Sequence, residues 1–134
     1  MLAVTANNVR SRHWTIYGGK YTSWHVLLGE IYDYLNEATD KVAENVVQSG
    51  GLPARSMADF IDGAMDNDTQ ESTLVVDWKY MVRYTAMELR RIIDYINDNA
   101  SAFDECTLND LTGIGSKLKH YEMFCNQTLK EAPM

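Results

Sequence analysis

The sequence predicts an all-α protein built as a four-helix bundle. Two observations support this: apolar residues recur at helical spacing through long runs without proline, and no run alternates apolar and polar residues as a strand bounded by turns would. A chain of 134 residues suffices for one core, so we expect a single domain over residues 1–134. The expected helices cover residues 2–14, 20–49, 55–64, 73–99 and 105–131.

The longest expected helix, 20–49, has the clearest apolar pattern. Its apolar residues are spaced alternately four and three positions apart, which places them on one side of a helix. Gly50-Gly51 ends it, as glycine does just past a helix C-terminus. The residues predicted to face the core are Trp24, Leu28, Ile31, Leu35, Ala38, Val42 and Val46.

The later helices complete the bundle. The connector 50–72 carries the short helix 55–64 and would cross over between the second and third long helices. Ser72 or Thr73 suits the N-cap of the next helix. The residues of the short helix predicted to face inward are Met57, Phe60 and Ile61. The apolar stripe of the last helix comprises Leu108, Leu111, Ile114, Leu118, Tyr121, Cys125 and Leu129.

Composition excludes several classes of protein. The net charge of −7 argues against nucleic-acid binding, which needs a basic patch. No apolar run is long enough to span a membrane, and the first residues lack the basic start and apolar run of a signal peptide. Cys106 and Cys125 lie roughly 28 Å apart on one expected helix, so they cannot bridge. Free thiols favour a cytoplasmic location.

A second face of the 20–49 helix carries the functional prediction. His25, Asp40 and Glu44 lie more than a right angle away from the apolar stripe, on a face that includes Gly29. This face is either plain solvent-exposed surface or a contact with a second subunit. If the same helix of a second copy lies antiparallel across a two-fold axis, His25 faces the partner's Glu44, and Gly29 faces the partner's Asp40.

His13, at the end of the first expected helix, is the natural second imidazole of this cluster. Histidine, aspartate and glutamate together form the mixed nitrogen and oxygen donor set of non-haem iron or a similar divalent metal. An Asp and a Glu four residues apart are by themselves a weak signal, because most such pairs are solvated surface. Their combination with the two histidines and the double glycine is more specific.

The same stretch resembles the core signature of the Dps family, the ferritin-like mini-ferritins. That signature has a His-Trp pair, a glycine-containing turn, a second His, a D-x-x-A-E motif and a double glycine. The segment from Asp104 to Thr107 also resembles the opening of the family's last helix. The matching residues here are His13-Trp14, Gly18, His25, Asp40-Lys41-Val42-Ala43-Glu44-Asn45 and Ser49-Gly50-Gly51.

The resemblance implies a ferroxidase centre shared between two subunits of a homo-oligomer. The matching positions are His13 and His25 of one chain, with Asp40 and Glu44 of the other. It further implies one or two iron ions per site, oxidation of Fe(II), preferably by hydrogen peroxide, and storage of ferric iron in a hollow dodecamer, which protects against oxidative damage. The two-fold contact would run through the 20–49 helix. Many family members bind DNA through a Lys-rich tail, which this acidic chain lacks.

The chain also departs from the family pattern. The family's further acid ligand, four residues after the second His, corresponds to Gly29, which has no side chain. Asp33, one turn further on, is a candidate replacement. The first helix is also shorter than is usual in the family. These departures leave an alternative, a non-catalytic Dps-like structural protein that oligomerises around a degenerate metal site.

Four further residues have expected roles near the site or at a pore. Trp14 and Tyr17 would lie beside the metal site, where packing is favoured over radical quenching. By the same resemblance, Asp104 and Glu105 would line a pore through which iron enters. The alternative for Asp104 is capping of the last helix.

Overall fold

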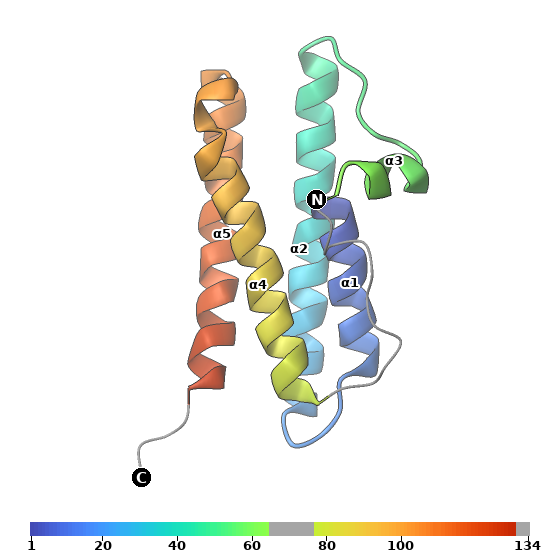
Figure 1. Cartoon of the computed structure of the whole chain (residues 1–134), viewed down its shortest axis with the longest axis vertical. Coiled ribbons are helices and arrows are strands. Elements are labelled where there is room, and N and C mark those ends of the chain that lie inside the picture. Colours follow the sequence, from blue (N-terminus) through green and yellow to red (C-terminus); the bar gives the residue numbers. More distant parts are fainter. Residues whose placement is uncertain (65–76, 131–134) are drawn as a thin grey trace. The chain divides into compact units, whose positions relative to one another are not determined.

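The computed structural model describes residues 1–64 and 77–130, and within them every regular element is a helix. The prediction of an all-α protein is therefore confirmed. The helices are α1 (Leu2–Thr15), α2 (Tyr21–Gln48), α3 (Met57–Asp62), α4 (Trp78–Asp98), the 3₁₀ helix η1 (Ala100–Ala102) and α5 (Glu105–Leu129) (Figure 1). No described helix is both long and apolar enough to cross a membrane.

The start of α4 shows where side-chain chemistry sets a boundary. Asp77 is the N-cap, and its carboxylate accepts a hydrogen bond of 2.9 Å from the backbone N–H of Tyr80. The helix therefore begins at Trp78, downstream of the predicted start at residue 73. The N-cap predicted at Ser72 or Thr73 lies outside the described residues.

The helices fall into two compact units, of which the first contains α1, α3 and nearly all of α2. Val42 and Val46, the last two predicted core residues of α2, are half-buried. The predicted apolar stripe is thus confirmed along most of the helix, because side chains at these spacings share one side of it. Five of the predicted core residues of α2 are buried: Trp24, Leu28, Ile31, Leu35 and Ala38.

The short helix α3 differs from its prediction. Ser56 caps it by accepting from the Asp59 N–H at 3.1 Å, and the Asp59 carboxylate accepts in turn from the Ser56 N–H. The inward orientation predicted for Met57 and Ile61 is wrong for the single chain, because their exposed fractions are 77% and 52%. Six residues make too few turns for spacing alone to specify a buried side.

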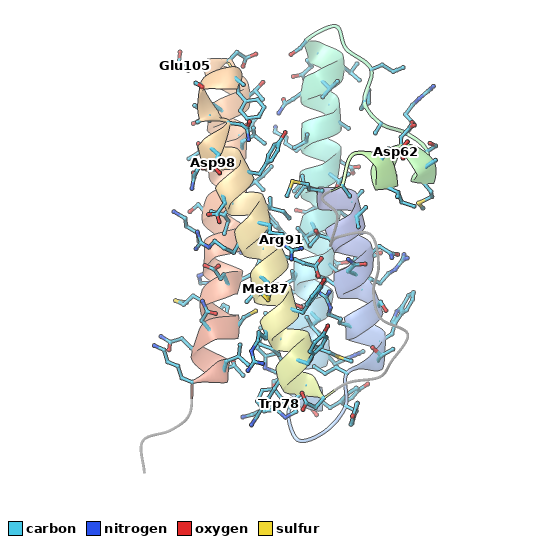
Figure 2. All side chains as sticks on the ribbon, viewed as in Figure 1. Asp62, Trp78, Met87, Arg91, Asp98 and Glu105 are labelled. Carbon is cyan, nitrogen blue, oxygen red and sulfur yellow. The ribbon has the colours of Figure 1, made fainter. Side chains whose placement is uncertain are left out.

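The second unit contains the 16–21 turn, α4, η1 and α5. Helices α4 and α5 run antiparallel side by side (Figure 1), with Asp98 at the end of α4 and Glu105 at the start of α5 (Figure 2). Gly18 has a φ of +101°, a conformation that favours glycine, and a Cβ atom at this position would lie 3.4 Å from the Trp78 side chain. The α5 stripe is confirmed along most of the helix: Leu108 and Leu129 are half-buried, and the buried members are Leu111, Ile114, Leu118, Tyr121 and Cys125.

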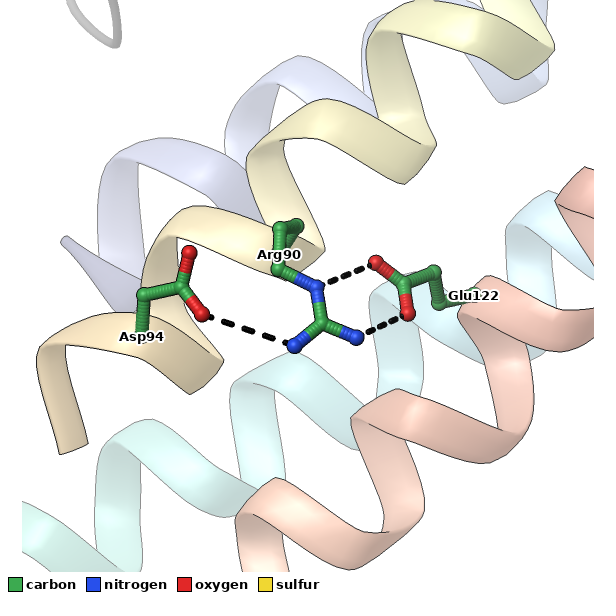
Figure 3. A network of polar contacts seen from close by, with 3 residues as sticks. All are labelled: Arg90, Asp94 and Glu122. Carbon is green, nitrogen blue, oxygen red and sulfur yellow. Dashed lines mark hydrogen bonds and ion pairs between the residues drawn. The ribbon is translucent and has the colours of Figure 1, made fainter. Parts of the chain in front are cut away.

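An ion pair joins α4 to α5 within this unit (Figure 3). Arg90 donates from Nε to Oε2 of Glu122 at 2.8 Å and from Nη2 to the other carboxylate oxygen, so the pair is bidentate. Nη1 also donates to Asp94, one turn along α4, at 3.4 Å. Because the hydrogen bonds to Glu122 stabilise the charged guanidinium, they raise the pKa of Arg90 above its ordinary value.

Candidate metal centre

The structure brings His13 and His25 together. His13 lies in the last turn of α1 and His25 near the start of α2, with their ring centroids 4.0 Å apart and the ring planes 14° from parallel. Each ring also bonds to the backbone of the other residue: His13 Nδ1 lies 2.6 Å from the carbonyl oxygen of His25, and His25 Nδ1 lies 2.7 Å from that of His13. We call this reciprocal pair the imidazole clasp.

The clasp determines which tautomer each ring adopts. A carbonyl oxygen only accepts hydrogen bonds, so Nδ1 must carry the proton in both rings. The neutral imidazole then has its lone pair on Nε2. Metal-binding histidines commonly use this arrangement, in which one ring nitrogen donates to a carbonyl and the other faces the metal. The donor chemistry of His13 and His25 therefore fits a divalent metal ion.

Gly29 lies directly beneath one ring of the clasp. A Cβ atom built on Gly29 would come within 2.9 Å of His13 Cε1 and 3.1 Å of His13 Nδ1. The position that the Dps signature fills with an acid therefore has no side chain here, and the His13 ring occupies the adjacent space. The candidate replacement, Asp33, is exposed on α2 one turn further on.

The two predicted acidic ligands lie on the same helix but far from the clasp. Asp40 and Glu44 are exposed, one turn apart on α2. At about 1.5 Å rise per residue, Asp40 lies roughly 22 Å and Glu44 roughly 28 Å along the helix from His25. One chain cannot bring all four residues to one ion. Accordingly, no three His, Cys, Asp or Glu side chains cluster in a metal-binding arrangement within residues 1–64 and 77–130.

An aromatic and cationic cluster, which the sequence did not predict, lies on the same two helices as the clasp. The guanidinium carbon of Arg10 lies 4.9 Å from the ring centroid of Trp14 and 5.7 Å from that of Tyr32. Trp14 and Tyr17, predicted to pack beside the site, are 64% and 48% exposed in the single chain. The spacing of Arg10 and Trp14 at i and i+4 was a readable signal for part of this cluster.

At the start of α5, Asp104 has the capping role that the sequence offered as an alternative. Its carboxylate accepts a hydrogen bond of 2.7 Å from the Thr107 N–H, which lowers the pKa of Asp104 below its ordinary value. Glu105 is the first residue of α5 and is exposed. Capping does not exclude a second role, because both side chains remain at the surface.

Comparison with known proteins places the chain in a structural class. The X-ray structure of Dps from Thermosynechococcus elongatus matches with a TM-score of 0.88 at 21% identity, over 98% of this chain and 84% of that one. A Dps protein from Vibrio cholerae, described as belonging to a superfamily of ferritin-like diiron-carboxylate proteins, matches with a TM-score of 0.80 at 22% identity, over 96% and 82%. The chain is therefore a ferritin-like, all-α four-helix bundle.

A sequence relative points to the same group. Antigen TpF1 of Treponema pallidum is 34% identical over 76 residues, which span 55% of this chain but only 43% of that protein. Its crystal structure matches with a TM-score of 0.87 at 24% identity, over 97% of this chain and 85% of that one. No family model matches the chain. These likenesses confirm the resemblance to the Dps family and establish the fold.

Proposed function

We propose that this chain is a mini-ferritin whose metal site forms between two subunits. In this site His13 and His25 of one chain, together with Asp40 and Glu44 of the partner subunit, bind Fe(II) for oxidation. The imidazole clasp is the observation that carries the proposal, because it presents two imidazoles in the tautomer that binds metal. The likeness to ferritin-like Dps proteins supports iron as the metal.

A two-fold pairing of α2 supplies the missing acids. The clasp lies near the start of α2, and the acids lie toward its end on an exposed surface. Antiparallel packing of two α2 helices about a dyad brings each clasp to the partner's acids and creates two equivalent sites. Asp33 is exposed on the same helix and is proposed as an auxiliary oxygen donor. By resemblance to Dps, twelve chains then assemble into a hollow shell.

Each group has a defined part in the proposed reaction. The carboxylates offset the charge of one or two bound iron ions, and the imidazoles fix their positions. Two Fe(II) ions each lose one electron, and one hydrogen peroxide takes both electrons and two protons to give two water molecules. Peroxide is thereby consumed without release of hydroxyl radical, and the ferric product is stored inside the assembly, which protects against oxidative damage.

The outlying residues take secondary roles in this proposal. Asp104 and Glu105, at the exposed start of α5, attract cations to a pore through which iron enters. Trp14 and Tyr17, both exposed in the single chain, supply oxidisable rings or packing surface for the neighbouring subunit. The net charge of −7 suits attraction of iron and opposes binding to DNA. A cytoplasmic location fits the two free cysteines.

The first test measures Fe(II) oxidation by hydrogen peroxide with metal-free protein. His25→Ala and Glu44→Ala should each lower the protein-dependent rate by at least about tenfold, because each removes a direct metal ligand. His120→Ala is the matched control, since His120 is exposed on α5 and is not one of the proposed ligands. A wild-type protein that leaves the oxidation rate unchanged would refute the proposal.

A complementation experiment tests whether the site is shared between chains. When His25→Ala and Glu44→Ala chains are refolded together, each mixed pair should regain one intact site, about half of the wild-type number. The control mixes the wild type with a chain carrying both substitutions, and its mixed pairs should have no intact site. If the site lay within one chain, the mixed pairs of the two single variants would have no intact site. The mixed pairs of the wild type with the doubly substituted chain would have one.

A structural protein without catalysis is the second candidate, and Gly29 favours it because this position offers no ligand. This candidate predicts that the oligomer forms with its normal mass while the purified protein binds no Fe(II) or Zn(II). Measuring mass and metal content on the same sample separates the two functions.

A further inference from the structure

Arg10 carries a positive charge that no carboxylate neutralises within the described part of the chain. Its Nη2 donates to the side-chain oxygen of Asn7 at 2.7 Å, and its guanidinium lies over the rings of Trp14 and Tyr32. Its Nε is buried and makes no hydrogen bond to any described residue. A buried donor without a partner is rare in folded proteins and is costly. The single chain therefore leaves the guanidinium incompletely satisfied.

Helix spacing places Arg10 about one turn from the imidazole clasp. On α1, Arg10 precedes His13 by three residues, and on α2, Tyr32 follows Gly29 by three residues. Residues three apart are neighbours on a helix surface. The contact of His13 with Gly29 and the contact of Arg10 with Tyr32 are therefore successive contacts between the same two helices. The guanidinium is a neighbour of the candidate metal centre.

The proposed two-fold pairing brings acids of the partner subunit to this level of α2. The pairing that sets Gly29 opposite the partner's Asp40 also sets Tyr32 opposite the partner's Glu37. Both acids are exposed, and neither forms an ion pair with a described residue of its own chain. At about 100° per residue, Asp40 lies roughly 20° around the helix from Gly29, whereas Glu37 lies roughly 80° from it. Asp40 is therefore the acid on the face that meets the partner.

We propose that Arg10 is the counter-ion of the partner's Asp40 in the metal-free assembly, and that a metal ion displaces it on binding. The inference rests on the proposed function, because it uses the same pairing of α2. Arg10 is then a positioning residue, whose planar fork of donors holds the carboxylate while the site is empty. Because position 29 has no acid, no carboxylate of the same chain at that position competes for the guanidinium.

Displacement of Arg10 would also make the site selective. A divalent ion attracts the carboxylate more strongly than a single positive charge does at the same distance. Ions that favour imidazole nitrogen, such as Fe(II) and Zn(II), additionally gain His13 and His25 as ligands. Mg²⁺ favours oxygen ligands and gains little from the imidazoles, so it should displace Arg10 poorly.

The proposal predicts that Arg10→Gln changes two measured quantities in opposite directions. The metal-free assembly loses an ion pair, so its unfolding temperature at fixed protein concentration should fall by roughly 5 °C. The affinity for Zn(II) should rise by about tenfold, because the ion no longer has to break that pair. A tenfold change corresponds to about 1.4 kcal/mol, the low end of the coupling measured for close charge pairs between proteins. A residue that only stabilised the fold would lower both quantities.

The experiment uses full-length, metal-free protein, thermal unfolding and calorimetric titration with Zn(II), which has no redox chemistry. Arg83→Gln is the matched control, because it removes the same charge from an exposed position on α4. It should leave the Zn(II) affinity unchanged. Arg10→Lys keeps the charge but loses the fork, so both of its values should lie between those of the wild type and Arg10→Gln. Unchanged or weaker Zn(II) binding by folded Arg10→Gln would overturn the proposal.

A double-mutant cycle identifies the acid. The loss of metal-free stability caused by Arg10→Gln should disappear in an Asp40→Asn background and persist in a Glu37→Gln background. Within one chain, Asp40 lies roughly 12 Å along α2 from Tyr32, so a coupling between Arg10 and Asp40 reports a contact between subunits. A loss that persists in full with Asp40→Asn would overturn the assignment, as would a loss that disappears with Glu37→Gln.

These measurements separate the failure of this inference from that of the proposed function. If the wild type binds Zn(II) and accelerates Fe(II) oxidation while Arg10→Gln alters neither Zn(II) affinity nor metal-free stability, the proposed function stands and the counter-ion role does not. If the wild type binds no Zn(II) and leaves Fe(II) oxidation unchanged, the proposed function fails and displacement by metal fails with it. The cycle would then report only on the ion pair between subunits.

Discussion

The ion pair between Arg90 and Glu122 allows a quantitative prediction. The same guanidinium also bonds to Asp94, and this second pair serves as an internal control. The Arg90 side chain is 42% exposed and that of Glu122 is 13% exposed, whereas Asp94 is 56% exposed. Two charges about 4 Å apart attract by about 4 kcal/mol at an effective dielectric constant near 20. Desolvation of Glu122 and ordering of the long Arg90 side chain offset most of this attraction.

We therefore expect a net coupling of about 1 kcal/mol for Arg90 with Glu122. The value lies at the upper end for exposed pairs, because the bond is bidentate and its acid is nearly buried. The pair with Asp94 is single, longer and exposed at both ends, so its coupling should be only about 0.3 kcal/mol. Both couplings involve Arg90, so the helix propensity of this residue cancels when the two couplings are compared.

Double-mutant cycles with Arg90→Ala, Glu122→Ala and Asp94→Ala, followed by urea unfolding, measure both couplings. Protein concentration must be held constant, since subunit association contributes to apparent stability. A coupling of about 1 kcal/mol corresponds to about 4 °C in Tm for a domain of this size. In about 1 M salt the Asp94 coupling should vanish while part of the Glu122 coupling remains. A Glu122 coupling no larger than that of Asp94 would refute the reasoning.

Two further perturbations probe the core and the α5 cap. Leu118→Ala should destabilise the protein by about 2 to 5 kcal/mol in urea unfolding, because Leu118 is fully buried in the second unit and its truncation leaves a cavity, whereas Thr112→Ala on the same helix should change little. The Asp104 pKa is lowered by the bonds to Thr107, so its stabilising contribution is present above the ordinary value of 3.8 and is lost as pH falls through the folded value. Asp104→Asn keeps a capping oxygen and should flatten the fall in stability below about pH 4; an equally steep fall in the variant would contradict this account.

The long helices were predictable because their patterns are strong and redundant. The α2 stripe repeats over seven positions from Trp24 to Val46, so a misassigned residue would not hide the period. The ends of the helices depend on single side chains, such as Asp77, and were therefore placed less accurately. The orientation of α3 failed for a related reason, since one and a half turns contain too few residues to define a face.

The candidate site was likewise predictable only in part. The polar face of α2 follows from spacing alone, and the resemblance to Dps named its residues. The imidazole clasp did not follow, because it depends on backbone carbonyls, which every residue has and no sequence pattern marks. Two features of α1 were not predicted: Arg12 is buried, and Arg10 lies over aromatic rings. A charged residue in a helix is ordinarily expected to be exposed to solvent.

Gly29 shows why counting ligands along a sequence gives an incomplete account of a metal site. Such a count treats position 29 as independent of position 13, and on that basis a glycine only subtracts a donor. In the folded chain the two positions adjoin, so a side chain at 29 would require the clasped ring of His13 to shift. A substitution that restores an acid at 29 would therefore add an oxygen donor and at the same time shift a nitrogen donor. For this reason we expect Gly29→Asp to alter metal affinity through His13, rather than to act as a simple gain of one ligand.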